Sequence, residues 1–391
     1  MIEKSNGEFV YLDNSSTCHP KPDCVWEAAR DYLQDVGVSP GRAGGARAAT
    51  AEGIVSDARR VLMDLFGGGD PRLVSFTANA THALNLAIRG MLKLGDHVIT
   101  TVLEHNSVLR PLELLRRQGV ITYDVLPIDG AGALDLAALP ALVKPATRLL
   151  IVNHASNVIG SVAPLDELGA FARGAGIAFA VDASQSAGWE DIDVDRSHID
   201  VLCFTGHKGL AGPSGVGGIF TRSPDDLEPL LVGGTGLNSQ SLLHPDVAPT
   251  KFEAGTLNYL GIAGLRASVA YVTSPEQRRK ALGARLLAAA CADGLRQIRG
   301  VTVYGRPGRP GTLPVFSFNI GDLYSREAAA VLDDEFGIVV RSGLHCAPLA
   351  HSSLGTSPQG SARVSLGRET TEHDVCQLLR SVEVLAARYG S

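Results

Sequence analysis

The sequence lacks the patterns that hold small secreted or metal-binding proteins together. Its 6 cysteines are scattered over 391 residues without CxxC spacing, so we expect neither a disulfide framework nor a metal site. The net charge is -6 and no basic block stands out, so nucleic acid is not an expected partner. The first residues form no apolar signal segment, and no apolar run reaches the roughly 18 residues of a membrane helix. We therefore expect a cytoplasmic protein without a membrane partner.

Apolar residues are plentiful, at 45% against 19% charged residues, which allows a large core. Short apolar runs typical of strands lie at 73–76, 97–102, 121–127, 148–153, 177–182, 199–205 and 216–221. Helical patterns separate several of them, at 80–92, 106–118, 134–143 and 164–175. This alternation predicts an α/β fold with a mostly parallel seven-stranded sheet. Functional residues should gather at the carboxyl ends of its strands.

A second organisation begins near residue 265. A helical stretch at 262–298, broken near Pro275, leads to strand patterns at 301–304, 315–319 and 338–341 and to helical patterns at 325–335 and 371–386. We expect a large domain at 1–264 and a smaller C-terminal α/β domain at 265–391, with residues 1–25 packing against the smaller one. Two long irregular segments, 233–259 and 343–361, are expected to be functional or mobile.

Lys208 lies just beyond the apolar run 199–205 and ahead of a glycine-rich segment at 209–218. A lysine at a strand end with open space around it suits Schiff-base chemistry on an aldehyde cofactor, pyridoxal phosphate (PLP). A solvated surface lysine gives the same local pattern. PLP also needs a carboxylate for its pyridine nitrogen, N–H groups for its phosphate and a flat group that stacks on its ring.

Two further segments offer parts of such a site. Asp182 ends the apolar run at 177–182, where a carboxylate is costly to bury unless it meets a cation such as a pyridinium. An N-cap for the next helix explains Asp182 equally well. The segment at 77–84 joins a strand to a helix start, where small residues expose N–H groups to an anion and Thr81 adds a hydroxyl. Many helices begin in this way, so this signal is weak by itself.

His105 and Asn157 each follow another predicted strand. The ring of His105 can stack on the cofactor, although a lone histidine is more often structural. The amide of Asn157 can bind the phenolic oxygen or simply make a turn. Jointly, His105, Asn157, Asp182 and Lys208 follow strands of one predicted sheet in that order, which favours a PLP site over four separate coincidences.

Several motifs resemble those of one enzyme family. They are YLDNSST at 11–17, EHN at 104–106, ASN at 155–157, VDASQ at 181–185, GHK at 206–208, FEAGT at 252–256 and RSGLHCA at 341–347. They extend over essentially the whole chain and resemble the class V aminotransferase group of fold-type I PLP enzymes, more narrowly the cysteine desulfurase and selenocysteine lyase family. The resemblance implies a fold-type I PLP-dependent transferase. The HCA setting is similar to group II desulfurases, whose active-site loop is short and ordered.

The resemblance assigns most of a cofactor site. It implies that Lys208 forms the Schiff base, that Asp182 pairs with the pyridinium and that His105 stacks on the ring and takes part in catalysis. Gln185 would reach the phenolic oxygen, with Asn157 nearby. The residues implied to hold the phosphate are Ala80, Thr81, Thr205, His207 and, from a neighbouring subunit, Thr256. That last contact implies a homodimer with shared active sites.

The resemblance also implies a reaction, the conversion of L-cysteine to L-alanine. Lys208 would move a proton, and the thiolate of Cys346 would attack the substrate sulfur and keep it as a persulfide, for delivery to a sulfur-acceptor protein. Such chemistry needs a reachable thiolate, and Arg341 and His345, close in sequence, would favour one. A leftover loop cysteine is the alternative interpretation of Cys346.

Arg363 is implied to bind the substrate carboxylate as a planar bidentate donor, together with Asn14 and Arg341, although a surface arginine shows the same sequence pattern. The chain departs from the family where a histidine is common near 40–45, and where Glu369 and Thr370 replace a common Tyr-Asn pair. These departures leave the substrate open. The alternatives are a PLP-dependent C–S lyase, a selenocysteine lyase or another class V aminotransferase-like enzyme, or a sulfur-relay or scaffold protein without catalysis.

Overall fold

A seven-stranded sheet forms the centre of the larger part of the molecule, as the alternating pattern predicts. The computed structural model describes residues 9–40 and 44–389. The strand order is β2 (Val74–Thr77), β8 (Gly217–Thr221), β7 (Val201–Thr205), β6 (Ala178–Asp182), β5 (Thr147–Asn153), β3 (Asp96–Thr101) and β4 (Ile121–Leu126). Only β8 runs antiparallel to its neighbours, β2 and β7. The other pairs are parallel, so the carboxyl ends of β3, β5, β6 and β7 share one edge.

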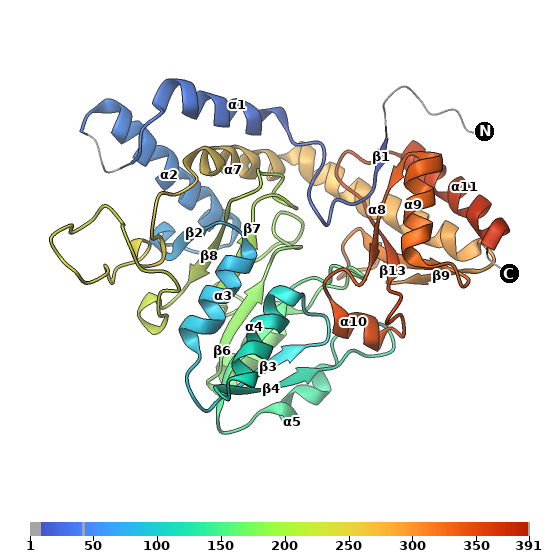
Figure 1. The fold of residues 1–391 in the computed structure, drawn as a ribbon, viewed down its shortest axis with the longest axis horizontal. Helices are drawn as coiled ribbons and strands as arrows, with labels where there is room; N and C mark the ends of the chain where they lie inside the picture. The colour runs from blue at the N-terminus through green and yellow to red at the C-terminus, as the bar shows by residue number, and fades with distance from the viewer. Residues whose placement is uncertain (1–8, 41–43, 390–391) are drawn as a thin grey trace.

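Helices cover both faces of this sheet (Figure 1). They are α1 (Asp23–Asp31), α2 (Ala46–Leu65), α3 (Ala80–Met91), α4 (Asn106–Arg117), α5 (Leu139–Leu142), α6 (Leu165–Ala175) and α7 (Tyr259–Val272). Alternate strand residues enter two different cores: in β7, Leu202 and Phe204 pack in one cluster and Val201 and Cys203 in the other. Both faces of the sheet are therefore buried, which explains the continuous apolar runs in the sequence.

A smaller antiparallel sheet forms with the C-terminal helices at the right of Figure 1. Its strands are β12 (Arg341–Gly343), β13 (Ser361–Ser365), β10 (Val315–Ile320) and β9 (Val301–Tyr304), and its helices are α8 (Pro275–Gln297), α9 (Ser325–Phe336), α10 (Pro348–Ser353) and α11 (Glu372–Tyr389). The N-terminal strand β1 (Val10–Tyr11) pairs in parallel with β11 (Ile338–Val339). This pairing joins the first described residues to the C-terminal half.

Helices α1 and α2 were not predicted from the sequence. Three details of the C-terminal half also differ from the sequence-based expectations. The strand predicted at 338–341 is divided between β11 and β12, which belong to different sheets. The segment predicted to be irregular at 343–361 contains α10. Strand β13 was not predicted, although Ser361, Arg363 and Ser365 alternate with apolar residues as in a half-buried strand; in the structure all five of its residues are buried. Burial of polar residues depends on their partners, which the local pattern does not contain.

The predicted domain boundary at 264/265 falls inside α7. Val269 and Val272 of α7 pack in a core of the large sheet, whereas Ala284 and Ala288 of α8 pack with the smaller sheet. The division stays a prediction, and these contacts favour a boundary at the break between the two helices. Among the residues described, no helix is long and apolar enough to cross a membrane.

Candidate active site

A cavity of about 80 Å³ lies at the shared carboxyl edge of the large sheet. Nine of the residues predicted for the cofactor site line it: Ala80, Thr81, His105, Asn157, Asp182, Gln185, Thr205, His207 and Lys208. They come from the ends of separate strands and from the start of α3. The parallel strand order brings these segments together, as the succession of strand-end residues predicted.

Lys208 has the electrostatics of a nucleophilic lysine. Burial lowers the pKa of its amine from 10.5 to about 8, and the guanidinium groups of Arg363 and Arg341 act in the same direction. The carboxylate of Asp182 opposes this shift. At neutral pH a much larger share of Lys208 is therefore uncharged than of an ordinary lysine, which suits attack on an aldehyde.

Asp182 and His105 are held by their own chain segments. Oδ1 of the buried Asp182 accepts hydrogen bonds from the backbone N–H of Ser184, at 2.9 Å, and from its hydroxyl. His105 is the N-cap of α4, and its Nδ1 accepts from the N–H of Ser107 at 3.1 Å. Burial, aided by the charge of Lys208, lowers the pKa of His105 to about 4. Its ring is therefore neutral, as stacking on a cofactor requires.

Three of the residues that line this cavity carry a buried polar atom without a hydrogen-bond partner within the described residues: Oδ1 of Asn157, Oγ1 of Thr205 and Nδ1 of His207. Buried polar groups are rarely left in this state unless a ligand or water completes them. The start of α3 lies beside them, with Asn79 as its N-cap. A Cβ at Gly217 of β8 would lie 2.6 Å from the carbonyl oxygen of Phe204 and 3.0 Å from the backbone of Asn79, so glycine is needed for this close packing. These residues fit a cofactor with a phosphate and a polar ring.

The loop that carries Cys346 lies against this part of the large sheet. The carbonyl of Cys346 accepts from the N–H of Asn106 at 2.7 Å, and Nη2 of Arg341 lies 3.7 Å from the sulfur. His345 points elsewhere: its Nδ1 lies 3.1 Å from Nε2 of the buried His351. Burial lowers the pKa of His345 to about 2, so its expected part in favouring the thiolate is not supported.

Arg363 is fully buried in β13 and already binds a carboxylate. Its Nη2 donates to Oδ1 of Asp13 at 2.5 Å and to Oγ of Ser16 at 3.0 Å. Its Nη1 donates to the carbonyl of Asn157 at 3.0 Å, and its Nε has no partner within the described chain. The surface-arginine alternative is therefore wrong, and the predicted binding of a substrate carboxylate by Arg363 stays a prediction.

Asn14 and Thr256 do not line the cofactor cavity. The amide of Asn14 binds backbone groups, donating to Ser365 O at 3.2 Å and accepting from His19 N at 3.2 Å. Asn14 lines a neighbouring cavity of about 580 Å³ that also touches Lys208. Thr256 is exposed in the long segment before α7. Neither residue meets the cavity within this chain, so their predicted roles stay predictions.

Sequence reasoning missed three residues at the site. Asp13 ends the YLD motif, and its position after an apolar pair was the available signal. Glu104 is fully buried, and its Oε1 accepts from Thr101 Oγ1 and Asn153 N, both at 2.8 Å. Arg368 donates to the carbonyls of Gly209, at 3.0 Å, and Gly188. Nothing in the sequence distinguishes Arg368 from a surface arginine.

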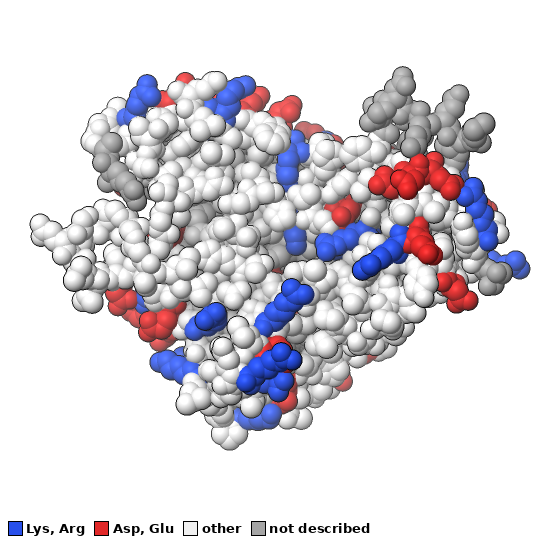
Figure 2. All heavy atoms as spheres, viewed as in Figure 1, with Lys and Arg blue, Asp and Glu red and all other residues white. Residues whose placement is uncertain are grey.

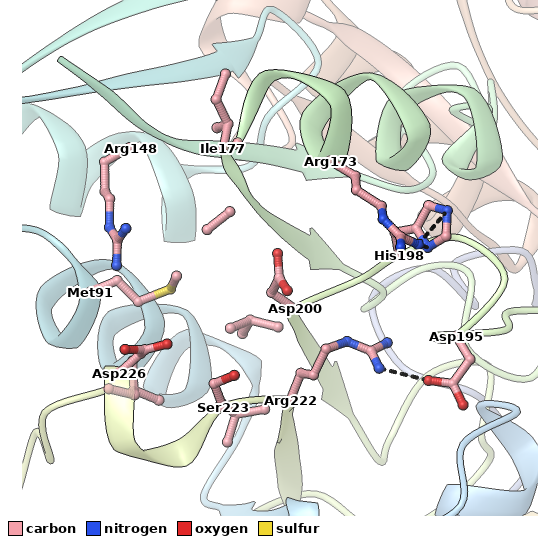
Figure 3. A pocket seen from close by; sticks show the side chains of 15 residues that line it. Met91, Arg148, Arg173, Ile177, Asp195, His198, Asp200, Arg222, Ser223 and Asp226 are labelled. Carbon is pink, nitrogen blue, oxygen red and sulfur yellow. Dashed lines mark hydrogen bonds and ion pairs between the residues drawn. The ribbon is translucent and has the colours of Figure 1, made fainter. Parts of the chain in front are cut away.

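A larger cavity, of about 640 Å³, lies at the opposite edge of the sheet (Figure 3). None of the predicted site residues lines it. Its charged groups are three arginines and three aspartates, with a histidine: Arg148, Arg173, Arg222, Asp195, Asp200, Asp226 and His198. None of these side chains is buried without a partner. The cavity therefore shows no preference for a ligand of either charge.

Fold and site together define a PLP-dependent enzyme of the aminotransferase type. A family model for aminotransferase class-V matches residues 10–378. A probable cysteine desulfurase of Methanothermobacter thermautotrophicus is 32% identical over 97% of this chain and 95% of that protein. One from Pyrococcus abyssi is 34% identical over 87% and 85%. The chain therefore belongs to the aminotransferase class-V family, within its cysteine desulfurase branch, and the family uses pyridoxal phosphate.

Solved structures agree with this assignment. The apo structure of a cysteine desulfurase from Thermococcus onnurineus NA1 matches with a TM-score of 0.90 at 31% identity, over 97% of this chain and 95% of that one. The cysteine desulfurase CsdA from Escherichia coli matches with a TM-score of 0.87 at 27% identity, over the same shares of the two chains. The predicted fold-type I architecture is thereby confirmed.

Proposed function

We propose that this protein is a cysteine desulfurase that converts L-cysteine to L-alanine and keeps the sulfur on Cys346. The observation that carries the proposal is the position of the Cys346 loop. Its backbone is bound to Asn106, the residue after His105, while the sulfur lies 3.7 Å from the guanidinium of Arg341. A thiol beside a cation, on a loop bound next to the cavity residue His105, is suited to attack a substrate held by the cofactor.

Each residue has a distinct task in this proposal. Bound PLP would hold the substrate amine and supply an electron sink for the negative charge that develops on the neighbouring carbon. Lys208 would bind the cofactor aldehyde and later move a proton, Asp182 would keep the pyridine nitrogen protonated, and His105 would stack on the ring. Gln185 would reach the phenolic oxygen. The phosphate would be held by Ala80, Thr81, Thr205 and His207.

The substrate carboxylate would bind Arg363, assisted by Arg341 and Asn14. Nη2 of Arg363 already donates to the carboxylate of Asp13. The substrate carboxylate would therefore bind the guanidinium beside Asp13 or displace Asp13. The thiolate of Cys346 would then attack the substrate sulfur. The bond between Cβ and sulfur breaks, its electron pair stays with the carbon side, and protonation of that carbon gives alanine. The sum is L-cysteine plus the Cys346 thiol giving L-alanine plus a Cys346 persulfide.

The test is incubation with L-cysteine, followed by amino-acid analysis and mass spectrometry of the Cys346 peptide. We expect alanine and a gain of one sulfur atom on that peptide, both lost in Cys346→Ala. The exposed Cys376 gives the matched control, since Cys376→Ala should keep both signals. Sulfur release at the normal rate from Cys346→Ala would refute the acceptor role.

We propose a homodimer with shared sites. The long segment before α7 protrudes at the left of Figures 1 and 2, and its visible surface there is uncharged. It exposes Leu237, Leu242, Leu243 and Val247 by 59%, 103%, 83% and 72%, and exposed apolar patches of this kind mark interfaces. Thr256, at the end of this segment, would then reach the partner's phosphate. Sedimentation should give a dimer, and Leu242→Lys with Leu243→Lys should give monomers that retain PLP poorly.

A second candidate is a C–S lyase, selenocysteine lyase or related enzyme acting on another amino acid. It is favoured by Glu369, whose carboxylate binds Lys280 at 2.8 Å and lines the 580 Å³ cavity beside Lys208. A larger or charged substrate could contact this pair. Screening amino acids for shifts in the PLP absorbance separates the two candidates.

Three further predictions, on localisation, on a partner and on the domain division, belong to the same proposal. The protein would be cytoplasmic and would pass its sulfur to an acceptor protein. It would work as a large and a small domain, predicted at about 1–264 and 265–391, and the contacts of α7 and α8 favour a boundary between these two helices. The family often has a histidine in the segment that corresponds to residues 40–45. Residues 41–43 of this segment lie outside the described residues.

A further inference from the structure

Asn157 contacts three parts of the site at once. Its Nδ2 donates to the carbonyl of His345 at 2.7 Å, directly before Cys346. Its backbone carbonyl accepts from Nη1 of Arg363 at 3.0 Å. Asn157 lines the cofactor cavity, and its Oδ1 is buried without a partner within the described residues. Asn157 thus lines the cofactor cavity, binds Arg363 and binds the loop that carries Cys346.

The orientation of this amide follows from its partners. A carbonyl oxygen only accepts hydrogen bonds, so the nitrogen of the amide must face His345. The turn that carries Asn157 is well fixed: the hydroxyl of Ser156 accepts from Val158 N at 3.2 Å, and Val158 O accepts from Ser317 Oγ at 2.8 Å. Asn157 is therefore held between the cavity that it lines and the loop that it binds.

The loop on the other side needs an external restraint. His345 and Cys346 have φ values of 49° and 57°, a left-handed conformation that is unfavourable for residues other than glycine. Their two carbonyls are held by Asn157 and by the N–H of Asn106. If the Asn157 bond were lost, the relaxation of this loop would move the sulfur of Cys346.

We propose that Asn157 is a positioning residue that couples occupancy of the cofactor cavity to the position of the Cys346 loop. An occupant of the cavity restrains the side chain of Asn157, which lines it, and this restraint strengthens the bond from Nδ2 to the carbonyl of His345. By thermodynamic linkage, the ordered loop strengthens binding in the cavity by the same factor. The significance for sulfur transfer rests on the proposed function, whereas the coupling itself does not.

The test compares the full-length protein with and without PLP, in the absence of substrate. Hydrogen exchange of the peptide spanning residues 343–347 and the rate of alkylation of Cys346 by iodoacetamide are measured in both forms, with the exposed Cys376 as the internal reference. PLP should slow both processes. Asn157→Asp removes the donor to His345 and so breaks the bridge that Asn157 forms between the cavity and the Cys346 loop. The part of the slowing by PLP that depends on this bridge should then vanish. That part should be about 2- to 12-fold, the range given by one neutral hydrogen bond.

Two further variants separate the bridge from other causes. Asn157→Ser, which is smaller and uncharged, should behave as Asn157→Asp does. Ser317→Ala removes a different bond to the same turn. It should retain the wild-type ratio of the exchange and alkylation rates without PLP to those with PLP. If Asn157→Asp and Asn157→Ser keep the wild-type ratio, PLP only shields the thiol and the coupling is wrong. Faster exchange on adding PLP would show that the amide flips, which also overturns it. Failure here would leave the alanine and persulfide assay unaffected.

Discussion

Asp13 and Arg363, which are 350 residues apart in the chain, form a buried ion pair with an O–N distance of 2.5 Å. Asp13 follows β1 and Arg363 lies in β13, so the pair ties the N-terminal segment to the smaller sheet. Burial lowers the pKa of Arg363, and the carboxylate of Asp13 opposes this shift. The arginine that is proposed to bind the substrate therefore depends on Asp13 for its charge balance in the free protein.

Removing Asp13 should be costly because it leaves a buried guanidinium without its counter-charge. We expect Asp13→Ala to lower the free energy of unfolding by roughly 3–5 kcal/mol, measured by urea titration. Asp322 is exposed and makes no ion pair in the described structure, so Asp322→Ala should change stability by less than about 0.5 kcal/mol. Equal effects of the two changes would show that the pair adds nothing.

Loading of the apoprotein with PLP should follow the titration of Lys208. Because burial lowers its pKa to about 8, about one tenth of the amine is uncharged at pH 7, and the loading rate should rise with pH and level off above about 8.5. Asp182 raises the pKa of Lys208, so Asp182→Asn should move the midpoint to lower pH. Stopped-flow absorbance measures both profiles. A midpoint near 10.5 would contradict the burial argument.

The buried Glu104 should make stability depend on pH. Burial raises its pKa to about 8, with a smaller contribution from Asp182. A carboxyl with a raised folded pKa stabilises the fold below its unfolded value of 4.5, and this contribution is lost as pH rises through 8. The full effect is roughly 3–5 kcal/mol. Glu104→Gln, a neutral isostere, should flatten the thermal midpoint between pH 5 and 9, and an unchanged slope would refute this assignment.

Arg368 should support the segment beside Lys208. Its guanidinium stacks 4.5 Å from the ring centroid of Trp189 and binds the carbonyls of Gly188 and Gly209. A lysine has no planar fork for these contacts, so we expect Arg368→Lys and Arg368→Met alike to release PLP faster on dialysis.

The exposed Arg296, paired with Asp293, provides the comparison for Arg368. Arg296→Met should keep the normal rate of PLP loss. Slow release from the Arg368 variants would mean that Trp189 and the glycine backbones hold this segment without the arginine.

The strands and most site residues of the larger part could be predicted because one physical rule connects them. Parallel strands buried on both faces appear as continuous apolar runs, and their carboxyl ends share an edge. Asp182 and Lys208 follow such runs, so their meeting in one cavity was predictable. Cys346 was recognised only through its motif, since no periodicity marks a reactive loop. Strand β13 was missed although its polar and apolar residues alternate, and helix α10 has only 6 residues, too few to show a helical period.

The sequence by itself determined the α/β architecture, the strand-end order of His105, Asn157, Asp182 and Lys208, and the cofactor that this order suits. Only the tertiary structure showed that Asp13 balances Arg363, that Asn157 binds the carbonyl before Cys346, and that His345 turns away from the sulfur. These contacts join residues from 6 to 350 positions apart. They depend on how separate sheets and loops pack, and hydrophobic periodicity records which side of an element is buried but not which distant side chain it meets.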